Sequence, residues 1–180
     1  MPERLSYEES YRSLQRQKWR GEGDIPPMPS HPPRYDDEVL GLEFFRTWLD
    51  GLKGADLTNM TLCRTYFGRS EINSVSFANS DLSESVANWN DFNLVDFTSA
   101  DLSRVDFRGN NVAECGFINT NFTDADLRCC SFEQCNFSGA LMARAKMTRA
   151  TGETLVLSDS HSQRLEIDWH DTDGDEPDGG

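Results

Sequence analysis

Val95–Gly109 reads VDFTS ADLSR VDFRG, three groups of five in which the middle residue is large and apolar. The same frame runs without a slip from Ala55 to Asp159, and only Ala87 and Gly152 lack a large middle residue. The first residue of each group is generally small, and Asp or Asn commonly stands second. A period of five drifts against both the helix and the strand periods, so neither element can keep one face over this length. The sequence therefore predicts a repeat architecture.

Three groups carry a resemblance to a known family: Ala55–Asn59 reads ADLTN, Ala100–Arg104 reads ADLSR and Ala125–Arg128 reads ADLR. The repeat resembles that of the pentapeptide-repeat proteins. The resemblance implies an all-β solenoid, a right-handed quadrilateral β-helix of about five coils, in which each five forms one side and four fives form one coil. It implies little about function, since such proteins include DNA-mimicking topoisomerase binders, toxin-neutralising partners and many without an assigned role.

The frame divides the chain into four segments. Residues 1–34 hold a short amphipathic stretch, for which we expect a helix, followed by a Pro-rich arm. Residues 35–54 carry apolar residues at helical spacing and are expected to form a helix that caps the open end of the solenoid. The β-helix is expected over residues 55–159. Residues 160–180 are expected to form a short C-terminal cap and an acidic, disordered tail.

Composition argues for a protein outside the membrane. Hydrophobic residues make up 37% of the chain, no apolar run approaches the roughly 20 residues of a membrane span, and the N-terminus lacks an apolar signal region. We therefore expect a cytoplasmic protein with no membrane partner. The formal net charge of −14 disfavours nucleic acid as a direct partner.

The five cysteines have a simpler explanation than metal binding or redox work. Cys115, Cys130 and Cys135 fall at the small inward place, where a thiol is a compact apolar filler, whereas Cys63 and Cys129 are expected to point outward. No Cys-x-x-Cys or Cys-x-x-His spacing exists, so no metal and no cofactor is expected. Cys115 and Cys135 should stack one coil apart, which leaves a disulfide bridge open as an alternative, although a reducing cytosol argues against it.

Residues twenty apart stack along one side of such a solenoid, with coils about 4.8 Å apart, so charge can be assigned to four faces. One face has no basic residue and is expected to be an acidic stripe of Glu71, Asp91, Glu114, Glu133 and Glu153. The adjacent face carries residue types common among interface anchors, namely Tyr66, Arg69, Trp89, Arg108, Arg128 and Arg149. The small Ala87 leaves open whether Trp89 turns inward or the coil bulges.

The other two faces and the interior give simpler expectations. One face stacks residues of alternating sign, which predicts a surface ion-pair ladder of Arg64, Glu84, Arg104, Asp124 and Arg144. The other face is small and polar. In the interior, Asn90 and Asn110 lie one coil apart and are expected to satisfy backbone groups or each other.

These patterns favour binding over catalysis. The sequence has no nucleophile elbow, no phosphate-binding glycine loop and no metal-ligand spacing, so we expect no enzyme activity. The first hypothesis is a monomeric module that docks and inhibits or neutralises a toxin or an enzyme through the arginine- and tryptophan-bearing face, most sharply as a bacterial immunity protein. The second, which the family resemblance supplies, is an acidic DNA mimic that binds and protects a topoisomerase such as gyrase. A structural scaffold of unassigned role is the third.

Overall fold

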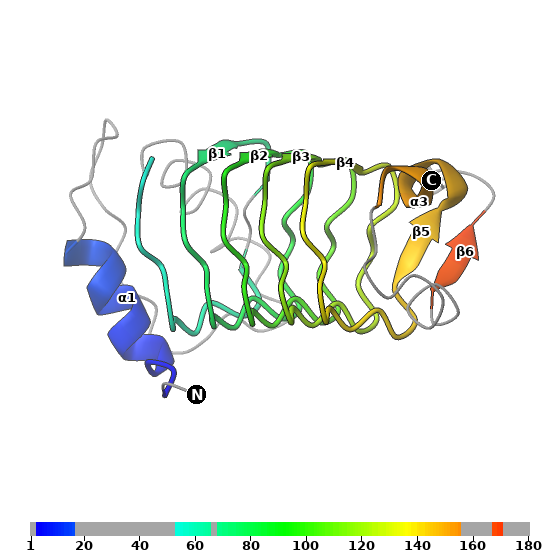
Figure 1. Ribbon diagram of the computed structural model, residues 1–180. Helices are drawn as coiled ribbons and strands as arrows, with labels where there is room; N and C mark the ends of the chain where they lie inside the picture. The colour runs from blue at the N-terminus through cyan, green and yellow to red at the C-terminus, as the bar shows by residue number, and fades with distance from the viewer. Residues whose placement is uncertain (1–2, 17–52, 66–67, 156–166, 171–180) are drawn as a thin grey trace, which may run out of the picture.

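The computed structural model describes residues 3–16, 53–65, 68–155 and 167–170. They form a solenoid whose coils lie side by side along one axis, with α1 at one end and α3, β5 and β6 at the other (Figure 1). In chain order, the helices and strands are α1 (Tyr7–Arg16), β1 (Glu71–Asn73), β2 (Asp91–Asn93), β3 (Asn111–Ala113), β4 (Ser131–Glu133), β5 (Lys146–Thr148), α3 (Arg149–Thr154) and β6 (Asp168–His170).

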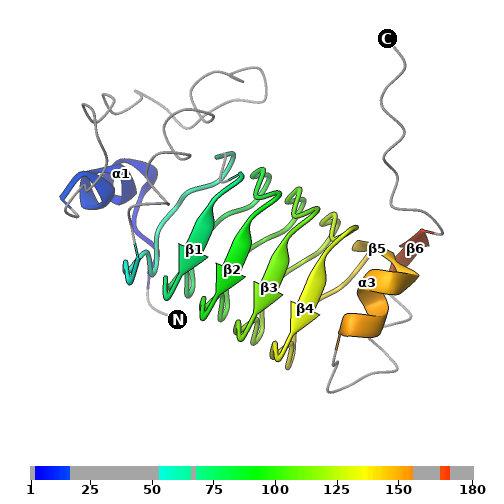
Figure 2. The same cartoon turned by 90° about the horizontal axis from the view of Figure 1, so that it is seen from above.

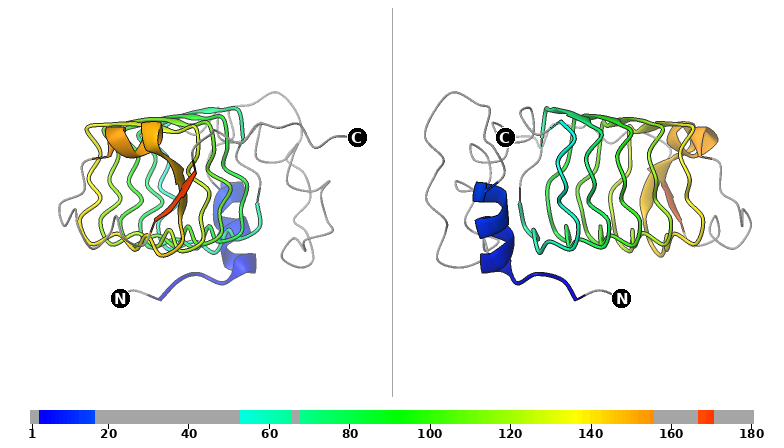
Figure 3. Two further views of the ribbon diagram at one scale, coloured as in Figure 1. Left: turned by 90° about the vertical axis from the view of Figure 1, so that its right-hand side faces the viewer. Right: turned by 60° about the vertical axis from the view of Figure 1, so that its left-hand side comes forward.

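Each coil contains twenty residues and has four sides. β1 to β4 are parallel neighbours in one sheet, and each residue pairs with the residue twenty positions later, as in Glu71 with Asp91. The other three sides are held by single parallel bridges with the same offset, for example Ser76 with Asp96. Seen along its axis, the solenoid has a rectangular outline (Figure 3). The expected four-sided β-helix is confirmed.

A turn at the end of each group of five explains the sequence frame. The fifth residue has a positive φ, as in Ser99 (58°) and Arg104 (56°), which lets the chain turn a corner. An Asp or Asn in second place holds the turn, because its side-chain oxygen accepts a hydrogen bond from the N–H two residues later. Asp96 Oδ1 accepts such a bond from Thr98 N at 2.9 Å. The recurring Asp is therefore a turn-forming residue.

The middle residues fill the interior. Phe97, Phe117 and Phe137 form a single internal column, with ring centroids 5.1 and 4.8 Å apart and interplanar angles of 4° and 11°. Phe92, from the adjoining side, and Phe107, from the opposite side, meet Phe97 edge to face at 5.5 and 6.3 Å. Aromatic rings prefer these stacked and edge-on arrangements, so the contacts help to hold the register between coils as well as burying apolar surface.

The first residue of each group also points inward, and polar side chains occupy this place where they can bond the backbone. Asn110 is fully buried; its Oδ1 accepts from Asn90 N at 2.7 Å and its Nδ2 donates to the carbonyl of Ala87 at 2.7 Å. Ser80 Oγ accepts in the same way from Met60 N at 3.0 Å. The expectation that the inward asparagines satisfy backbone groups is confirmed, since Asn90 Oδ1 likewise accepts from Ser70 N at 3.0 Å. The side chains do not bond each other, and Asn90 Nδ2 is buried without a hydrogen-bond partner among the described residues.

The N-terminal helix lies against the first coil. Just before α1, Leu5 N donates to the carbonyl of Asn59 at 2.7 Å, and Thr61 N donates to Ser10 Oγ at 2.8 Å. Leu5 also packs against the hydrophobic core. The predicted Pro-rich arm, and all but the last two residues of the capping helix predicted over residues 35–54, lie outside the described residues.

The far end departs from the predicted frame. Residues 149–154 form α3, so the side that the frame centres on Gly152 is a helix and not a fifth strand of the sheet. Gly152 has no side chain to fill the interior, and the ring of Trp169 takes that space, since a Cβ on Gly152 would lie 2.4 Å from it. α3 also covers the free edge of β4, where Phe132 N donates to Thr154 Oγ1 at 3.1 Å. The β-helix expected to continue through residue 159 gives way to α3, and the fifth coil is incomplete.

The internal column leads to a first prediction. Phe117→Ala should lower the free energy of unfolding by about 3–5 kcal/mol, because it removes a fully buried ring stacked on both sides and leaves a cavity. Leu141→Ala is the control; Leu141 is 55% exposed, and its truncation should change the free energy by less than about 0.5 kcal/mol. Urea unfolding followed by circular dichroism measures both, and equal losses would contradict the internal position of Phe117.

Candidate protein-binding faces

The outward side of the β1–β4 sheet, which we call the acidic face, carries four exposed carboxylates: Glu71, Asp91, Glu114 and Glu133. The four strands lie side by side and present this face as one continuous surface (Figure 2). The four strands contain no Lys or Arg, and the residue that follows each strand is not Lys or Arg either. Among the described residues of the β1–β4 side, the carboxylates therefore have no Lys or Arg beside them.

Hydrogen bonds order part of the acidic face. Asn111 Nδ2 donates to Asp91 Oδ1 at 2.8 Å, and Ser131 Oγ donates to Asn111 Oδ1 at 3.2 Å. Leu94, the residue after β2, is 50% exposed and has a φ of 54°. The face thus combines carboxylates with one exposed apolar side chain.

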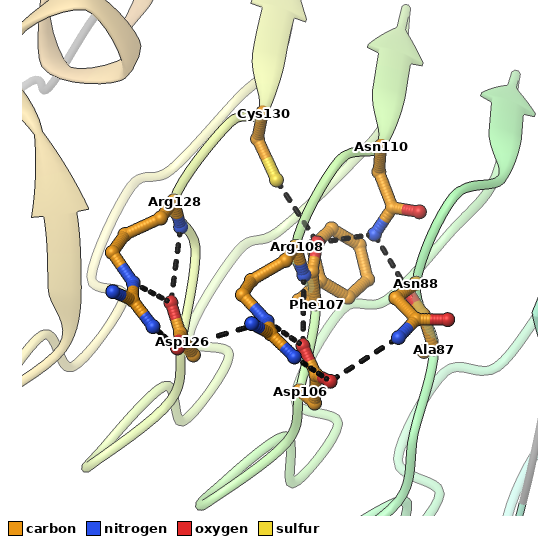
Figure 4. A network of polar contacts seen from close by, with 9 residues as sticks. All are labelled: Ala87, Asn88, Asp106, Phe107, Arg108, Asn110, Asp126, Arg128 and Cys130. Carbon is orange, nitrogen blue, oxygen red and sulfur yellow. Dashed lines mark hydrogen bonds and ion pairs between the residues drawn. The ribbon is translucent and has the colours of Figure 1, made fainter. Parts of the chain in front are cut away.

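The adjacent side, which we call the arginine face, is a ladder of carboxylate–guanidinium pairs (Figure 4). Arg108 donates through Nε and Nη2 to the two oxygens of Asp106 at 2.8 and 2.9 Å, and Arg128 donates in the same way to Asp126 at 2.9 and 2.7 Å. Arg108 Nε also lies 3.9 Å from Asp126 Oδ2, which links the two coils. In both fives Asp stands second and Arg fourth, so one turn brings each pair together.

Of the two ion pairs on the arginine face, the pair of Asp126 and Arg128 is less exposed than the pair of Asp106 and Arg108. Their side chains are 17% and 16% exposed, against 25% and 35% for Asp106 and Arg108. Burial of the Asp126 carboxyl raises its pKa, but the hydrogen bonds from Arg128 and the positive charges of Arg128 and Arg108 together hold the pKa below its ordinary value. The same carboxylate raises the pKa of Arg128. The positive charges of Arg108 and Arg128 are thus each balanced by a carboxylate on the same face.

Trp89 points outward and lies against the next coil. Its side chain is 50% exposed, and a Cβ on Gly109 would lie 2.5 Å from the indole, so Gly109 makes room for the ring. Backbone hydrogen bonds of 2.7 and 3.0 Å run from Ala87 and Trp89 to the next coil, and the coil does not bulge. The small Ala87 instead borders an apolar cavity of about 10 Å³, room for about one water molecule.

The structure brings together only part of the two predicted faces. On the arginine face it places Arg69, Trp89, Arg108 and Arg128. Arg149 and Glu153, which were predicted to extend the arginine face and the acidic stripe, lie in α3 instead, because the repeat frame breaks at Gly152. Tyr66 lies outside the described residues.

The ion-pair ladder predicted on the third side is confirmed in two parts, with no ion pair between Arg104 and Asp124 among the described residues. Arg64 Nε and Arg104 Nη2 lie 2.5 and 2.6 Å from the carboxylate of Glu84, and Arg144 donates to Asp124 at 2.6 and 2.7 Å. These pairs are solvent-exposed, so each contributes little to stability.

Two other kinds of site are absent from the described part of the chain. Within residues 3–16, 53–65, 68–155 and 167–170, no group of three or more His, Cys, Asp or Glu side chains is placed to hold a metal ion. No helix among these same residues is long and apolar enough to span a bilayer.

Comparisons with known proteins point to the same repeat. A family model described as pentapeptide repeats matches residues 115–151 with eight copies. A pentapeptide-repeat protein from the thylakoid lumen of Arabidopsis thaliana is similar, with 28% identity and a TM-score of 0.50 over 52% of this chain and 66% of that chain. Rfr23, a pentapeptide-repeat protein of the cyanobacterium Cyanothece, has 17% identity and a TM-score of 0.41 over 49% of this chain and 56% of that chain.

A third similar structure is QnrB1, a plasmid-mediated fluoroquinolone resistance protein, with 15% identity and a TM-score of 0.44 over 67% of this chain and 62% of that chain. This chain therefore spans less than two thirds of the length of each of these solved chains. No curated protein matches the sequence.

The arginine face leads to a second prediction. Asp126→Asn should lower the free energy of unfolding by about 1 kcal/mol at neutral pH, because it removes the charge that pairs with Arg128 on a partly exposed surface. The turn should survive, since Asn121 Oδ1 accepts the same bond from Thr123 N at 3.1 Å. Because folding lowers the pKa of Asp126, its contribution is present above the unfolded pKa of about 3.9 and is lost as the pH falls through the folded pKa.

Urea unfolding at neutral pH and below about pH 4 measures this effect, and the difference between wild type and variant should shrink in acid. Asp96→Asn is the matched control, because Asp96 makes the same turn bond and has no ion pair within the described residues. A pH-independent difference for Asp126→Asn, or an equal one for Asp96→Asn, would show that the pair with Arg128 is not the cause.

Proposed function

Because the chain is a pentapeptide-repeat protein, we propose that it is a non-enzymatic module that docks a partner protein and inhibits or neutralises it. The most specific form of this role that we propose is the neutralisation of a bacterial toxin. The proposed docking surface is the arginine face with Trp89 at its centre, and the chain acts as a monomer.

The observation that carries the proposal is the exposed indole of Trp89. Half of this side chain faces solvent, and its backbone has a φ of 58°, where a bulky residue is uncommon. Trp is enriched among the residues that dominate binding energy, and covering its ring with a partner would remove a large apolar surface from water. Gly109 lies directly against the ring, so the indole is positioned before docking and loses little freedom.

The paired arginines support the proposal as fixed charged groups on the same face as Trp89. Arg108 and Arg128 each make two hydrogen bonds to one carboxylate, so their guanidinium groups are oriented before a partner arrives. Fixed groups of both signs favour a partner with the complementary pattern and disfavour others. Such a surface suits one protein better than polyanions in general.

The third prediction compares two exposed side chains of one coil. Trp89→Ala should weaken partner binding by about 30-fold, the loss of about 2 kcal/mol that marks a hot spot. Leu94→Ala is the matched control, because Leu94 is also 50% exposed and also stands fifth in its group but lies on the acidic face. Its truncation should leave binding unchanged.

The partner would be sought among the products of adjacent genes, coexpressed with tagged protein, and its affinity measured by isothermal titration calorimetry. A toxin partner should stop growth when expressed alone, and coexpression of the wild type should restore growth. Loss of binding in Leu94→Ala alone, or equal loss in both variants, would contradict docking through the arginine face.

A second candidate function, an acidic mimic of DNA that binds and protects a topoisomerase such as gyrase, is favoured by the acidic face. Its carboxylates share one side with no basic residue, and the whole chain has a formal net charge of −14. A basic groove that normally holds DNA would attract such a surface by charge complementarity.

The fourth prediction tests this second candidate in a DNA gyrase supercoiling assay, with and without a fluoroquinolone. A mimic should change the yield of supercoiled DNA, and the double substitution Glu114→Gln, Glu133→Gln should reduce that effect by removing two charges from the face. The substitutions leave Trp89 intact, so the two candidate functions are separated. No effect of the wild-type protein would exclude gyrase as the target.

A further inference from the structure

Cys115 and Cys135 occupy the same inward place in consecutive coils, at the corner beside the acidic face. Cys115 is 2% exposed, and Cys135 is half-buried. The backbones of the two coils are paired at this point: Asn136 N donates to the carbonyl of Cys115 at 3.1 Å, and Gly116 forms a parallel bridge with Asn136. Paired parallel strands lie about 4.8 Å apart, a separation of Cα atoms that a disulfide spans.

Both thiols bond backbone carbonyls, and the Cys115 thiol donates to the carbonyl of Ala113 at 3.2 Å. The interaction between the two thiols lowers the pKa of Cys135 and raises that of Cys115, which burial raises further. Cys115 Sγ also accepts from Val95 N at 3.4 Å, and Cys135 Sγ donates to the carbonyl of Val112 at 3.5 Å. Both sulfurs therefore lie in one inward column. Cys135 is the more accessible and the more nucleophilic of the two.

The other three cysteines are placed differently. Cys130 lies on another side of the coil, its Sγ donates to the carbonyl of Phe107 at 2.9 Å, and burial raises its pKa. Cys63 and Cys129 stand at outward places of their groups. Only Cys115 and Cys135 share one place in consecutive coils.

We propose that Cys115 and Cys135 are a redox-sensitive pair that a small disulfide, such as glutathione disulfide, converts to a disulfide bond between coils. The Cys135 thiolate attacks one sulfur of the oxidant; its S–S bond breaks, one glutathione thiolate leaves and a mixed disulfide forms. Cys115 then loses its proton, and its sulfur attacks that of Cys135 and displaces the second glutathione thiolate. The protein gives up two electrons and two protons, and the oxidant takes them up as two thiols.

The bond would close a loop of one coil and would join the two coils that carry Glu114 and Glu133. Cross-linking restricts the unfolded chain, so the oxidised protein should unfold at a higher temperature than the reduced protein. The redox state would thus set the stability of this end of the acidic face.

The experiment uses full-length protein equilibrated in glutathione buffers from reducing to oxidising, then alkylated, digested and analysed by mass spectrometry. We expect a linked peptide containing Cys115 and Cys135 and a higher midpoint of thermal unfolding, both reversed by dithiothreitol. Cys115→Ala and Cys135→Ala should each abolish the linked peptide and the shift. Ala is accommodated at this place, since Ala100 and Ala125 occupy it elsewhere and are buried.

Cys129→Ala is the matched control and should retain both the linked peptide and the shift. Circular dichroism of the reduced variants checks that each one folds. The proposal is overturned by a glutathione adduct that persists on Cys135, by a linkage to Cys129 or Cys130, or by thiols that stay reduced across the whole range of buffers.

Discussion

The parallel backbone hydrogen bonds between coils are the constraint on which the rest of the structure depends. Each coil bonds the next at a fixed offset of twenty residues, so every side chain lies over the side chain at the equivalent place one coil away. Inside, this register stacks Phe97, Phe117 and Phe137 in one column. On the outside, the same register places charged groups of consecutive coils one strand spacing apart, about 4.8 Å. Core packing and surface charge therefore follow from the same register.

The same constraint makes the two ends different from the middle. An end coil has a neighbour on one side only, and its backbone groups need another partner. At the N-terminal end Leu5 and Ser10 supply hydrogen bonds to the first coil, and at the other end Thr154 of α3 bonds the exposed edge of β4. Short helical segments thus take the place of the missing coils.

Stacking also decides which surfaces keep their charge. Opposite charges neutralise one another where they meet, as in Arg64, Glu84 and Arg104 or in Asp126 and Arg128. The acidic face stacks carboxylates with amides and hydroxyls, so its negative field is retained. The arginine face keeps little net charge but exposes an aromatic ring in a fixed position. The two faces therefore present different chemistry, one with a negative charge and one with paired charges and an exposed indole.

The sequence by itself determined which residue of each five points inward, because a strict period of five keeps one place on one face. The coil of four fives was implied by the resemblance to pentapeptide-repeat proteins, and with it the internal Phe column and the third-side ion pairs could be predicted. The tertiary structure alone decided that Asp126 neutralises Arg128, that the Trp89 ring lies against Gly109, and that the solenoid ends at α3. These features depend on contacts between side chains or on space left by a missing Cβ. Gly109 and Gly152 are examples. The ring of Trp89, twenty residues earlier, lies against Gly109, and the ring of Trp169 in β6 lies against Gly152, and neither contact can be predicted from the repeat.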